Sequence, residues 1–379
     1  MINRTQETLH RLDNLNSQYQ KVSNQMSTGR KIEKGSDDAT LFVREIYVED
    51  KINVFEGIKQ QIDKTTVHNS VSDSAVDNAK KLLEQVKSEL ITANTDTTTP
   101  EGRKAIAVSI AGVKQNLLDL ANTRVDGEYL FSGSDSSIRP FEQDTNGEVE
   151  YKGDNRLRKI AVDEGSYRDK GINGFDMMMY NSDVATANNP NLDFEETQRI
   201  VDQDGFEWKL NPAKTDIERY DYNGNVTSDT KPVINVAGTP SVYTVDVGTD
   251  NGTKFEAKTN IFDKIDKIVN ALNKVDDVGN PITQAQSDAS LSSSLEEINK
   301  AYDSVNIAHA ELGGRNKVFE ISQEKVSSKL TQYNVMYQEV GGADLAKAAV
   351  QAKALEMTFN ALYSTINKTN ELSLVNFIR

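Results

Sequence analysis

Apolar residues recur every three or four positions at both ends of the chain, and this spacing constrains the fold more than any other feature of the sequence. Near the N-terminus the stripe consists of Leu12, Leu15, Tyr19, Val22 and Met26. Near the C-terminus it consists of Leu345, Ala348, Ala352, Leu355, Phe359, Leu362 and Ile366. Such spacing places every member of a stripe on one side of a helix, as in a coiled coil. The sequence therefore predicts two terminal helices that pack against each other and against neighbouring copies.

The N-terminal stripe is too small to stabilise its helix alone. Burying its five members contributes roughly 10 kcal/mol, at about 1.5–3 kcal/mol each. Ordering about 30 residues costs on the order of 1 kcal/mol or more per residue, and hydrogen bonding offsets only part of that cost. We therefore expect the termini to be loose in the isolated chain and to fold on assembly.

Composition excludes several classes of protein. The chain has 379 residues, of which 37% are apolar, and this low fraction favours an elongated or assembled protein over one large globule. The net charge is −15, so we expect neither nucleic-acid binding nor attachment to anionic membranes. The absence of cysteine excludes disulfides and thiolate sites. Residues 1–10 do not resemble a cleavable signal peptide, so we expect any export to use a route that does not read one.

Further helices and a β-rich segment occupy the middle of the chain. Thr99-Pro100-Glu101 predicts a helix start, with a capping hydroxyl, a fixed φ and a carboxylate at the positive end of the dipole. Between Phe131 and Thr259 the sequence contains four Asn-Gly pairs, at positions 146, 173, 223 and 251, which predict tight turns between short strands. Helical spacing returns at Ile261, and glycine pairs at 313–314 and 341–342 predict two helix ends.

The predicted fold class is mainly α, with an antiparallel coiled-coil core formed by the N- and C-terminal helices and an outward β-rich insertion. We divide the chain into a terminal coiled-coil domain (1–32 and 345–379), a helical rod domain (33–130 and 260–344) and an inserted β-rich domain (131–259). Helices from both ends pair, and the β domain interrupts them from the middle of the chain.

No group of residues in the sequence has the spacing of an active site or a metal site. His10, His68 and His309 are far apart, and we interpret them as surface or helix-face residues. Residues 202–205 (Asp-Gln-Asp-Gly) only partly match a calcium loop and are better explained as a hairpin loop. Asp37-Asp38 is explained as a helix start, and Met177-Met178-Met179 as an apolar strand or turn. We therefore predict no enzyme activity, no cofactor and no bound metal.

Two segments carry a family resemblance. Residues 25–39, QMSTGRKIEKGSDDA, resemble the N-terminal signature of the bacterial flagellin superfamily, and residues 344–378 are similar to its closing helix. The GEYLFSG run at 127–133, followed by Arg139-Pro-Phe141, Tyr151-Lys-Gly-Asp154 and the closing Leu-Ser-Leu, resembles the superfamily's hook-associated members at the hook–filament junction. Ala39 departs from the proline that many of these proteins carry, and the resemblance does not extend to residues from about 165 to 255.

The resemblance implies a structural adaptor outside the cell. It implies a layer of copies between hook and filament, with the other hook-associated junction protein and flagellin as neighbours. It also implies export through the flagellar type III apparatus and an export chaperone on the C-terminal helix. The assembly interface would use both apolar stripes, together with Leu372, Leu374 and Phe377. The alternatives are a flagellin filament subunit and an extracellular adhesin-like module on a helical stalk. The insertion's polar loops and its single Trp208 permit the adhesin reading but do not support it.

Overall fold

The computed structural model describes residues 2–95, 98–145, 147–222, 224–236 and 241–377, with side chains from residue 6 to residue 368. The chain forms two compact units, residues 1–60 with 323–379, and residues 61–322. The helices are α1 (Ile2–Thr28), α2 (Ala39–Ala93), α3 (Pro100–Ala121), α4 (Gly174–Met178), α5 (Ile261–Leu272), α6 (Gln284–Gly341) and α7 (Leu345–Phe377).

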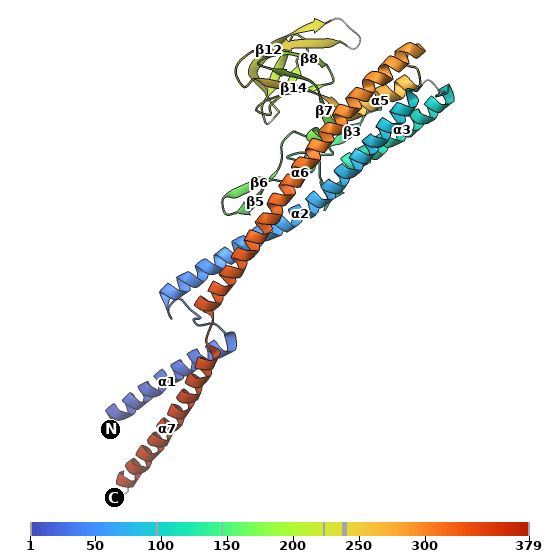
Figure 1. Ribbon diagram of the computed structural model, residues 1–379. Helices are drawn as coiled ribbons and strands as arrows, with labels where there is room; N and C mark the ends of the chain where they lie inside the picture. Colours follow the sequence, from blue (N-terminus) through green and yellow to red (C-terminus); the bar gives the residue numbers. More distant parts are fainter. Residues whose placement is uncertain (1, 96–97, 146, 223, 237–240, 378–379) are drawn as a thin grey trace. The chain divides into compact units, whose positions relative to one another are not determined.

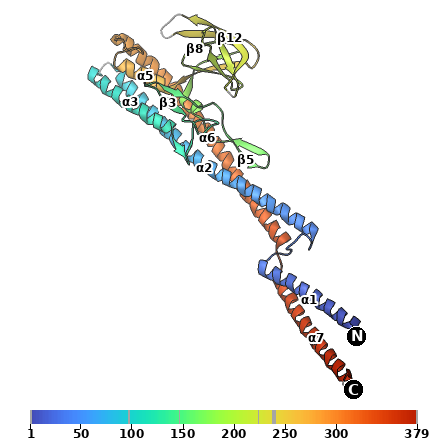
Figure 2. The ribbon, with the colours of Figure 1, turned by 180° about the vertical axis from the view of Figure 1, so that it is seen from behind.

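In the first unit, α1 and α7 lie side by side and antiparallel, with both chain ends at the same end of the pair (Figures 1 and 2). The N-terminal part of α2 and the C-terminal part of α6 pack through Phe55 and Tyr333, whose stacked rings lie 5.6 Å apart. Val48, Phe55, Ile58, Val326 and Leu330 are buried in this unit. Coiled-coil spacing in the sequence therefore corresponds to paired helices in the structure.

In the second unit, α2, α3, α5 and α6 share a core that also contains Met177, Met178 and Met179. The start of α3 is capped as predicted, because the Thr99 hydroxyl accepts a hydrogen bond from the Gly102 N–H at 3.1 Å. Three short hairpins accompany this core: β1 (Arg124–Val125) with β2 (Glu128–Tyr129), β3 (Phe141–Gln143) with β4 (Val149–Tyr151), and β5 (Lys159–Asp163) with β6 (Ser166–Asp169).

The remaining strands form one antiparallel eight-stranded sheet, in the order β7-β14-β9-β10-β11-β12-β13-β8. Their bounds are β7 (Met179–Thr186), β8 (Asn191–Glu195), β9 (Arg199–Asp202), β10 (Glu207–Leu210), β11 (Asp216–Tyr220), β12 (Val226–Val236), β13 (Val242–Asp246) and β14 (Lys254–Asn260). The two edge strands are consecutive in the chain, and the sheet curls around one core that includes Phe194, Trp208, Tyr243 and Phe255 (Figure 1).

The predicted fold class is confirmed: the chain is mainly helical, its terminal helices pair, and one β-rich segment interrupts the helices. Asp38 begins α2 as expected, since its carboxylate accepts a hydrogen bond from the Leu41 N–H at 2.9 Å. The loop at 202–205 does join two hairpin strands, β9 and β10.

Three sequence expectations are wrong. The helix predicted to stop at Gly313-Gly314 continues to Gly341, because tertiary packing on both sides of the pair outweighs the low helix propensity of glycine. Asn173-Gly174 caps α4 instead of closing a hairpin, with the Asn173 side chain accepting from the Asp176 N–H at 2.7 Å. The turn at Asn251-Gly252 separates β13 from β14, which do not pair with each other but with strands far from them in the sequence.

Candidate assembly surface

The α1–α7 pair is held by contacts between the two predicted stripes. Val22 and Ala348 are buried, and the Tyr19 and Phe359 rings meet edge to face at 6.2 Å. Leu12, Leu15, Ala352, Leu355, Phe359, Leu362 and Ile366 are partly buried. The structure therefore brings the two stripes together within one chain, but it buries few of their members completely.

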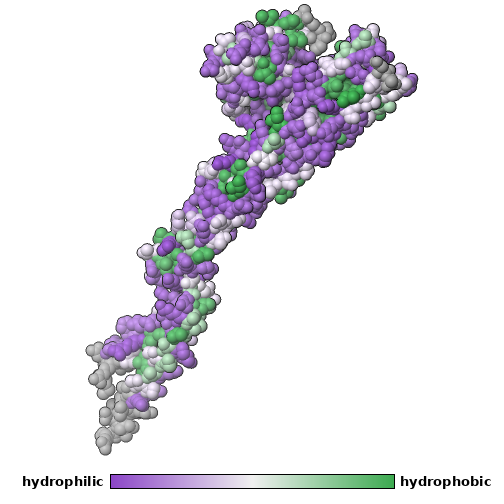
Figure 3. Space-filling view, in the orientation of Figure 1, coloured by the Kyte–Doolittle hydropathy of each residue, from purple (hydrophilic) through white to green (hydrophobic). Residues whose placement is uncertain are grey.

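Much apolar surface of this helix pair is open to solvent. Of the predicted stripe residues, Tyr19, Met26 and Leu345 are exposed. Leu9, Val350, Met357 and Tyr363, which the sequence analysis did not select, are exposed as well. Figure 3 shows apolar side chains at the surface of the pair. Large exposed apolar side chains on a helix pair are typical of a surface that binds a partner.

The side chains of Leu372, Leu374 and Phe377 lie outside those that the structure describes. The backbone of these residues continues α7. Their predicted part in the interface stays a prediction.

A short connection between α1 and α2 fixes the end of the α1–α7 pair. Gly29 ends α1 with φ +68°. The Lys31 N–H donates to the Gly341 carbonyl at 2.7 Å, and the Ala343 N–H donates to the Gly29 carbonyl at 2.8 Å. Arg30 and Gly342 thereby form a β-bridge between the segments that precede α2 and follow α6. Backbone hydrogen bonds therefore hold the segment before α2 against the segment after α6.

An ion pair supports this bridge. The Arg30 Nη2 lies 2.6 Å from Oε1 of Glu45, whose side chain is only 2% exposed. The hydrogen bond that Arg30 donates to Glu45, followed by the charge of that carboxylate, raises the pKa of Arg30. A Cβ at Gly341 would lie 3.0 Å from Oε1 of the same carboxylate, so a larger residue there would press on the Glu45 side chain. Sequence reasoning missed Glu45, and the only available signal was a charged residue among the apolar positions of α2.

A second exposed apolar surface lies at the start of α2. Val43, Ile46 and Tyr47 project from one side of this helix and are about half or more exposed. On α6, Val335 is exposed in the same compact unit. This surface, which was not predicted, extends the apolar area available to a partner beyond α1 and α7.

Of the two settings expected for the histidines, surface or helix face, His68 has the second: it lies on α2 and is buried against the hairpins. His309 contacts Asp73, with 3.0 Å between Nε2 and Oδ1. Among the described residues, no group of three or more His, Cys, Asp or Glu side chains is arranged to hold a metal ion. Within that same part of the chain, every helix is too short or too polar to cross a membrane.

The insertion's Trp208 is not available as a surface contact. Its ring is buried against Phe255, and its Nε1–H donates to Asp202 Oδ2 at 2.9 Å. Trp208 therefore stabilises the core of the sheet.

Comparisons with known proteins point to the bacterial flagellum. The family described as the bacterial flagellin N-terminal helical region matches residues 2–136. Flagellar hook-associated protein 3 of Salmonella typhimurium is 23% identical over 145 residues, which cover 38% of this chain and 45% of that protein. The chain thus spans less than half the length of this curated relative.

Solved structures share the fold over most of the chain. The crystal structure of FlgL from Xanthomonas campestris has a TM-score of 0.53 at 19% identity, covering 77% of this chain and 99% of that one. Flagellar hook associated protein-3 from Legionella pneumophila gives a TM-score of 0.52 at 18% identity, covering 78% and 98%.

Proposed function

We propose that this chain is a structural subunit of the layer that joins hook and filament, because residues 2–136 match the flagellin N-terminal helical region and the fold is similar to that of hook-associated protein 3. The observation that carries the proposal is the α1–α7 pair with its exposed apolar residues, of which α1 lies within the flagellin-type match at residues 2–136. The relatives found by comparison are named hook-associated proteins, which favours a junction subunit over a filament subunit or an adhesin.

We propose that neighbouring copies bury the apolar faces left open by the single chain. Val350 is 71% exposed and Met357 is 61% exposed on α7. Burying such side chains stabilises an interface by roughly 1–2 kcal/mol each, after allowing for the part already covered. A layer of identical subunits requires head-to-tail contacts, in which two different surfaces of one subunit meet on successive copies. The α1–α7 pair and the exposed face of α2 offer two such surfaces.

In this role the protein would have two different neighbours in the flagellum and would leave the cell by the flagellar export route. The hook-side neighbour would be the other hook-associated junction protein, and the distal neighbour would be flagellin. Export would use the flagellar type III apparatus, with a chaperone on α7, and the protein would work outside the cell. It would act through assembly and not as an enzyme.

Complementation tests this proposal. Cells from which the gene is deleted should build hooks without filaments and release flagellin into the medium. Val350→Glu should fail to restore filaments, because it places a charge where a neighbouring helix packs. Gln351→Glu is the matched control, since Gln351 is exposed on the adjacent position of α7. The amount of exported protein must be equal for both variants.

Full filament growth with exported Val350→Glu would contradict the assigned interface. Filaments in the deletion strain itself would contradict the junction role.

A further inference from the structure

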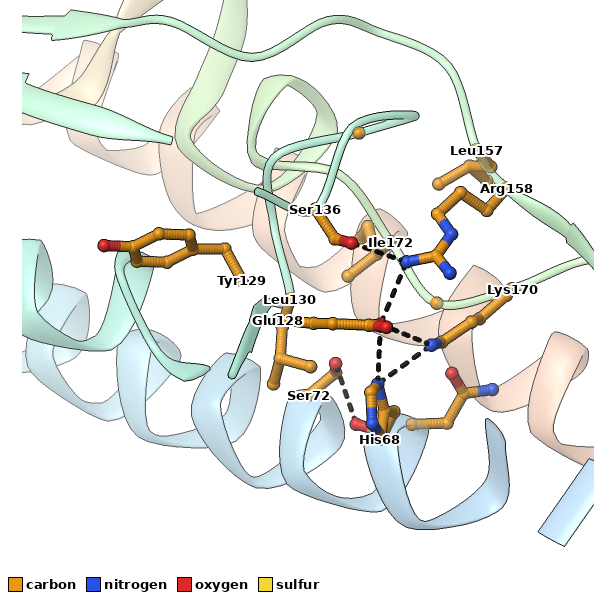
Figure 4. Close-up of a pocket in the computed structure, with 13 residues that line it drawn as sticks. His68, Ser72, Glu128, Tyr129, Leu130, Ser136, Leu157, Arg158, Lys170 and Ile172 are labelled. Atoms are coloured by element: carbon orange, nitrogen blue, oxygen red, sulfur yellow. Dashed lines mark hydrogen bonds and ion pairs between the residues drawn. The ribbon is translucent and has the colours of Figure 1, made fainter. Parts of the chain in front are cut away.

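A partly buried group of polar side chains ties two hairpins to α2. His68 lies on α2, Glu128 on β2, Arg158 just before β5, and Lys170 just after β6. Figure 4 shows these four side chains converging on one point. We call them the His68 cluster. The His68 side chain is only 1% exposed, so the cluster is closed off from solvent on the side of the helix.

Each member contacts another member at short distance. The Arg158 Nη1–H donates to Glu128 Oε2 at 2.9 Å and to Ser136 Oγ at 2.7 Å. Lys170 Nζ lies 2.8 Å from His68 Nδ1 and 3.7 Å from Glu128 Oε2. The β5–β6 hairpin is thus attached to α2 and β2 through the side chains at its two ends.

The contact between Lys170 and His68 determines the protonation of the ring. A lysine ammonium can only donate, so His68 Nδ1 must accept, and the neutral ring carries its proton on Nε2. His68 Nε2 lies 3.5 Å from Oδ2 of Asp126, too far for a good hydrogen bond. Protonating the ring would place a hydrogen on Nδ1 facing the ammonium of Lys170. The ammonium of Lys170 therefore favours the neutral ring in this arrangement, against the carboxylate of Glu128, whose Oε2 lies 3.9 Å from His68 Nδ1.

Burial and the charge of Lys170 also favour the neutral form of His68. Burial, followed by the charge of Lys170, lowers the pKa of His68, although Asp126 and Glu128 act against this shift. Burial, followed by the charge of Arg158, lowers the pKa of Lys170 to about 8.

The groups that face the cluster come from every element packed around it. Lys64 on α2 bonds to Glu128 at 3.3 Å. From α6, Arg315 donates to the Gly171 carbonyl at 3.0 Å, next to Lys170. For Glu128, burial raises the pKa, but the bonds from Arg158 and Lys64 and the charges of Arg158 and Lys170 outweigh it and lower the pKa to about 2. Glu128 therefore stays ionised throughout the range in which His68 titrates.

Polar groups beside the cluster are poorly satisfied. Both polar side-chain atoms of Asn69, and Nε2 of His68, are buried without a hydrogen-bond partner among the described residues. They border a cavity of about 20 Å³, which is large enough for one water molecule. Leu130 and Ile172, which also line this cavity, pack with the main core, so the polar groups are concentrated on its other side.

We propose that the His68 cluster is a proton-operated clamp, which holds the β1–β2 and β5–β6 hairpins on α2 while His68 is neutral and releases them when His68 is protonated. This inference does not depend on the proposed junction role, because it rests on contacts within residues 61–322.

The pH range in which the clamp opens follows from the lowered pKa of His68. The unfolded or opened segment binds a proton at the ordinary histidine pKa of 6.5, whereas the closed cluster binds it only at lower pH. The opened state therefore gains stability as the pH falls below about 6.5, by up to about tenfold per pH unit until the closed cluster also protonates. Protonation of Glu128 causes a separate loss of stability of the closed cluster, which begins only below the ordinary glutamate pKa of 4.5.

Amide hydrogen exchange of the full chain at pH 7.5 and pH 5.5, corrected for the intrinsic rate, tests the clamp. Peptides covering residues 158–172 should lose up to about tenfold in protection at pH 5.5, while those from α3 should not change. His68→Gln should remove this response, because its amide oxygen accepts from Lys170 but cannot titrate. His309→Gln is the matched control and should keep the response. Equal protection of the wild type at both pH values, or the same loss in His68→Gln, would overturn the proposal.

A second measurement decides the matter if His68→Gln does not fold. NMR titration of the histidine rings should give His68 a midpoint below 6.5, and Lys170→Met should raise that midpoint. An unchanged midpoint in Lys170→Met would overturn the proposal, because the clamp requires the ammonium to oppose protonation of the ring.

Discussion

Arg30→Ala should open the bridge between the segment before α2 and the segment after α6. Removing a partner from a buried ion pair costs about 3–5 kcal/mol, whereas exposed pairs contribute about 0–1 kcal/mol. Glu45 is 2% exposed and Arg30 is 50% exposed, so the pair lies between these limits. We expect a local loss of about 2 kcal/mol, which corresponds to a roughly thirtyfold increase in the opening equilibrium.

Hydrogen exchange at two backbone amides measures this loss directly. The Lys31 N–H and the Ala343 N–H form the bridge, at 2.7 and 2.8 Å from their acceptors. Both should exchange roughly thirtyfold faster in Arg30→Ala. Arg44→Ala, which removes an exposed arginine from the same unit, should change the stability by less than about 0.5 kcal/mol.

A double variant separates the ion pair from other effects of the substitution. Arg30→Ala with Glu45→Gln should recover part of the lost protection, because it removes the buried charge that Arg30→Ala leaves unpaired. Equal exchange in Arg30→Ala and Arg44→Ala would refute the assigned role of the pair. A double variant no better than Arg30→Ala would show that the buried charge is not the cause.

Two further predictions concern residues 61–322. Gly174→Ala should destabilise the chain by about 1–3 kcal/mol in thermal unfolding, because the added Cβ would lie 2.7 Å from the rings of Phe141 and Tyr151. Gly313→Ala, where the added Cβ meets open space, should instead stabilise α6 by about 0.5–1 kcal/mol. Equal melting temperatures of the two variants would contradict this. Because the pKa of Glu128 is lowered to about 2 from 4.5, its stabilising contribution should be complete above pH 4.5 and lost as the pH falls toward 2, and Glu128→Gln should make acid unfolding in that range less steep; an unchanged slope would contradict the assigned contacts.

The helical part of the fold could be predicted because its signals are local. The stripes at both ends, the Thr99 cap and the break at Gly341-Gly342 depend on residues within one or two helical turns of each other. Each of these signals corresponds to a feature of the structure: paired helices, the start of α3 and the end of α6.

The features that the sequence did not predict depend on residues that are distant from each other in the sequence. An Asn-Gly pair allows a tight turn, but strand pairing decides which strands it joins, and β13 and β14 pair elsewhere. His68 and Lys170 are 102 residues apart and meet only in the folded chain. Glu45 is recognisable as important only once the bridge at Arg30 is known. The exposed faces of α1, α2 and α7 are a tertiary property as well, since spacing alone does not reveal which side of a stripe the chain covers.

Immunogold electron microscopy of the producing cells, with antibody against residues 133–259, tests the central claim most directly. A junction subunit should be labelled in one band where the curved hook meets the filament. Label along the whole filament would mean a filament subunit, and label on the cell body away from any flagellum would contradict the flagellar assignment.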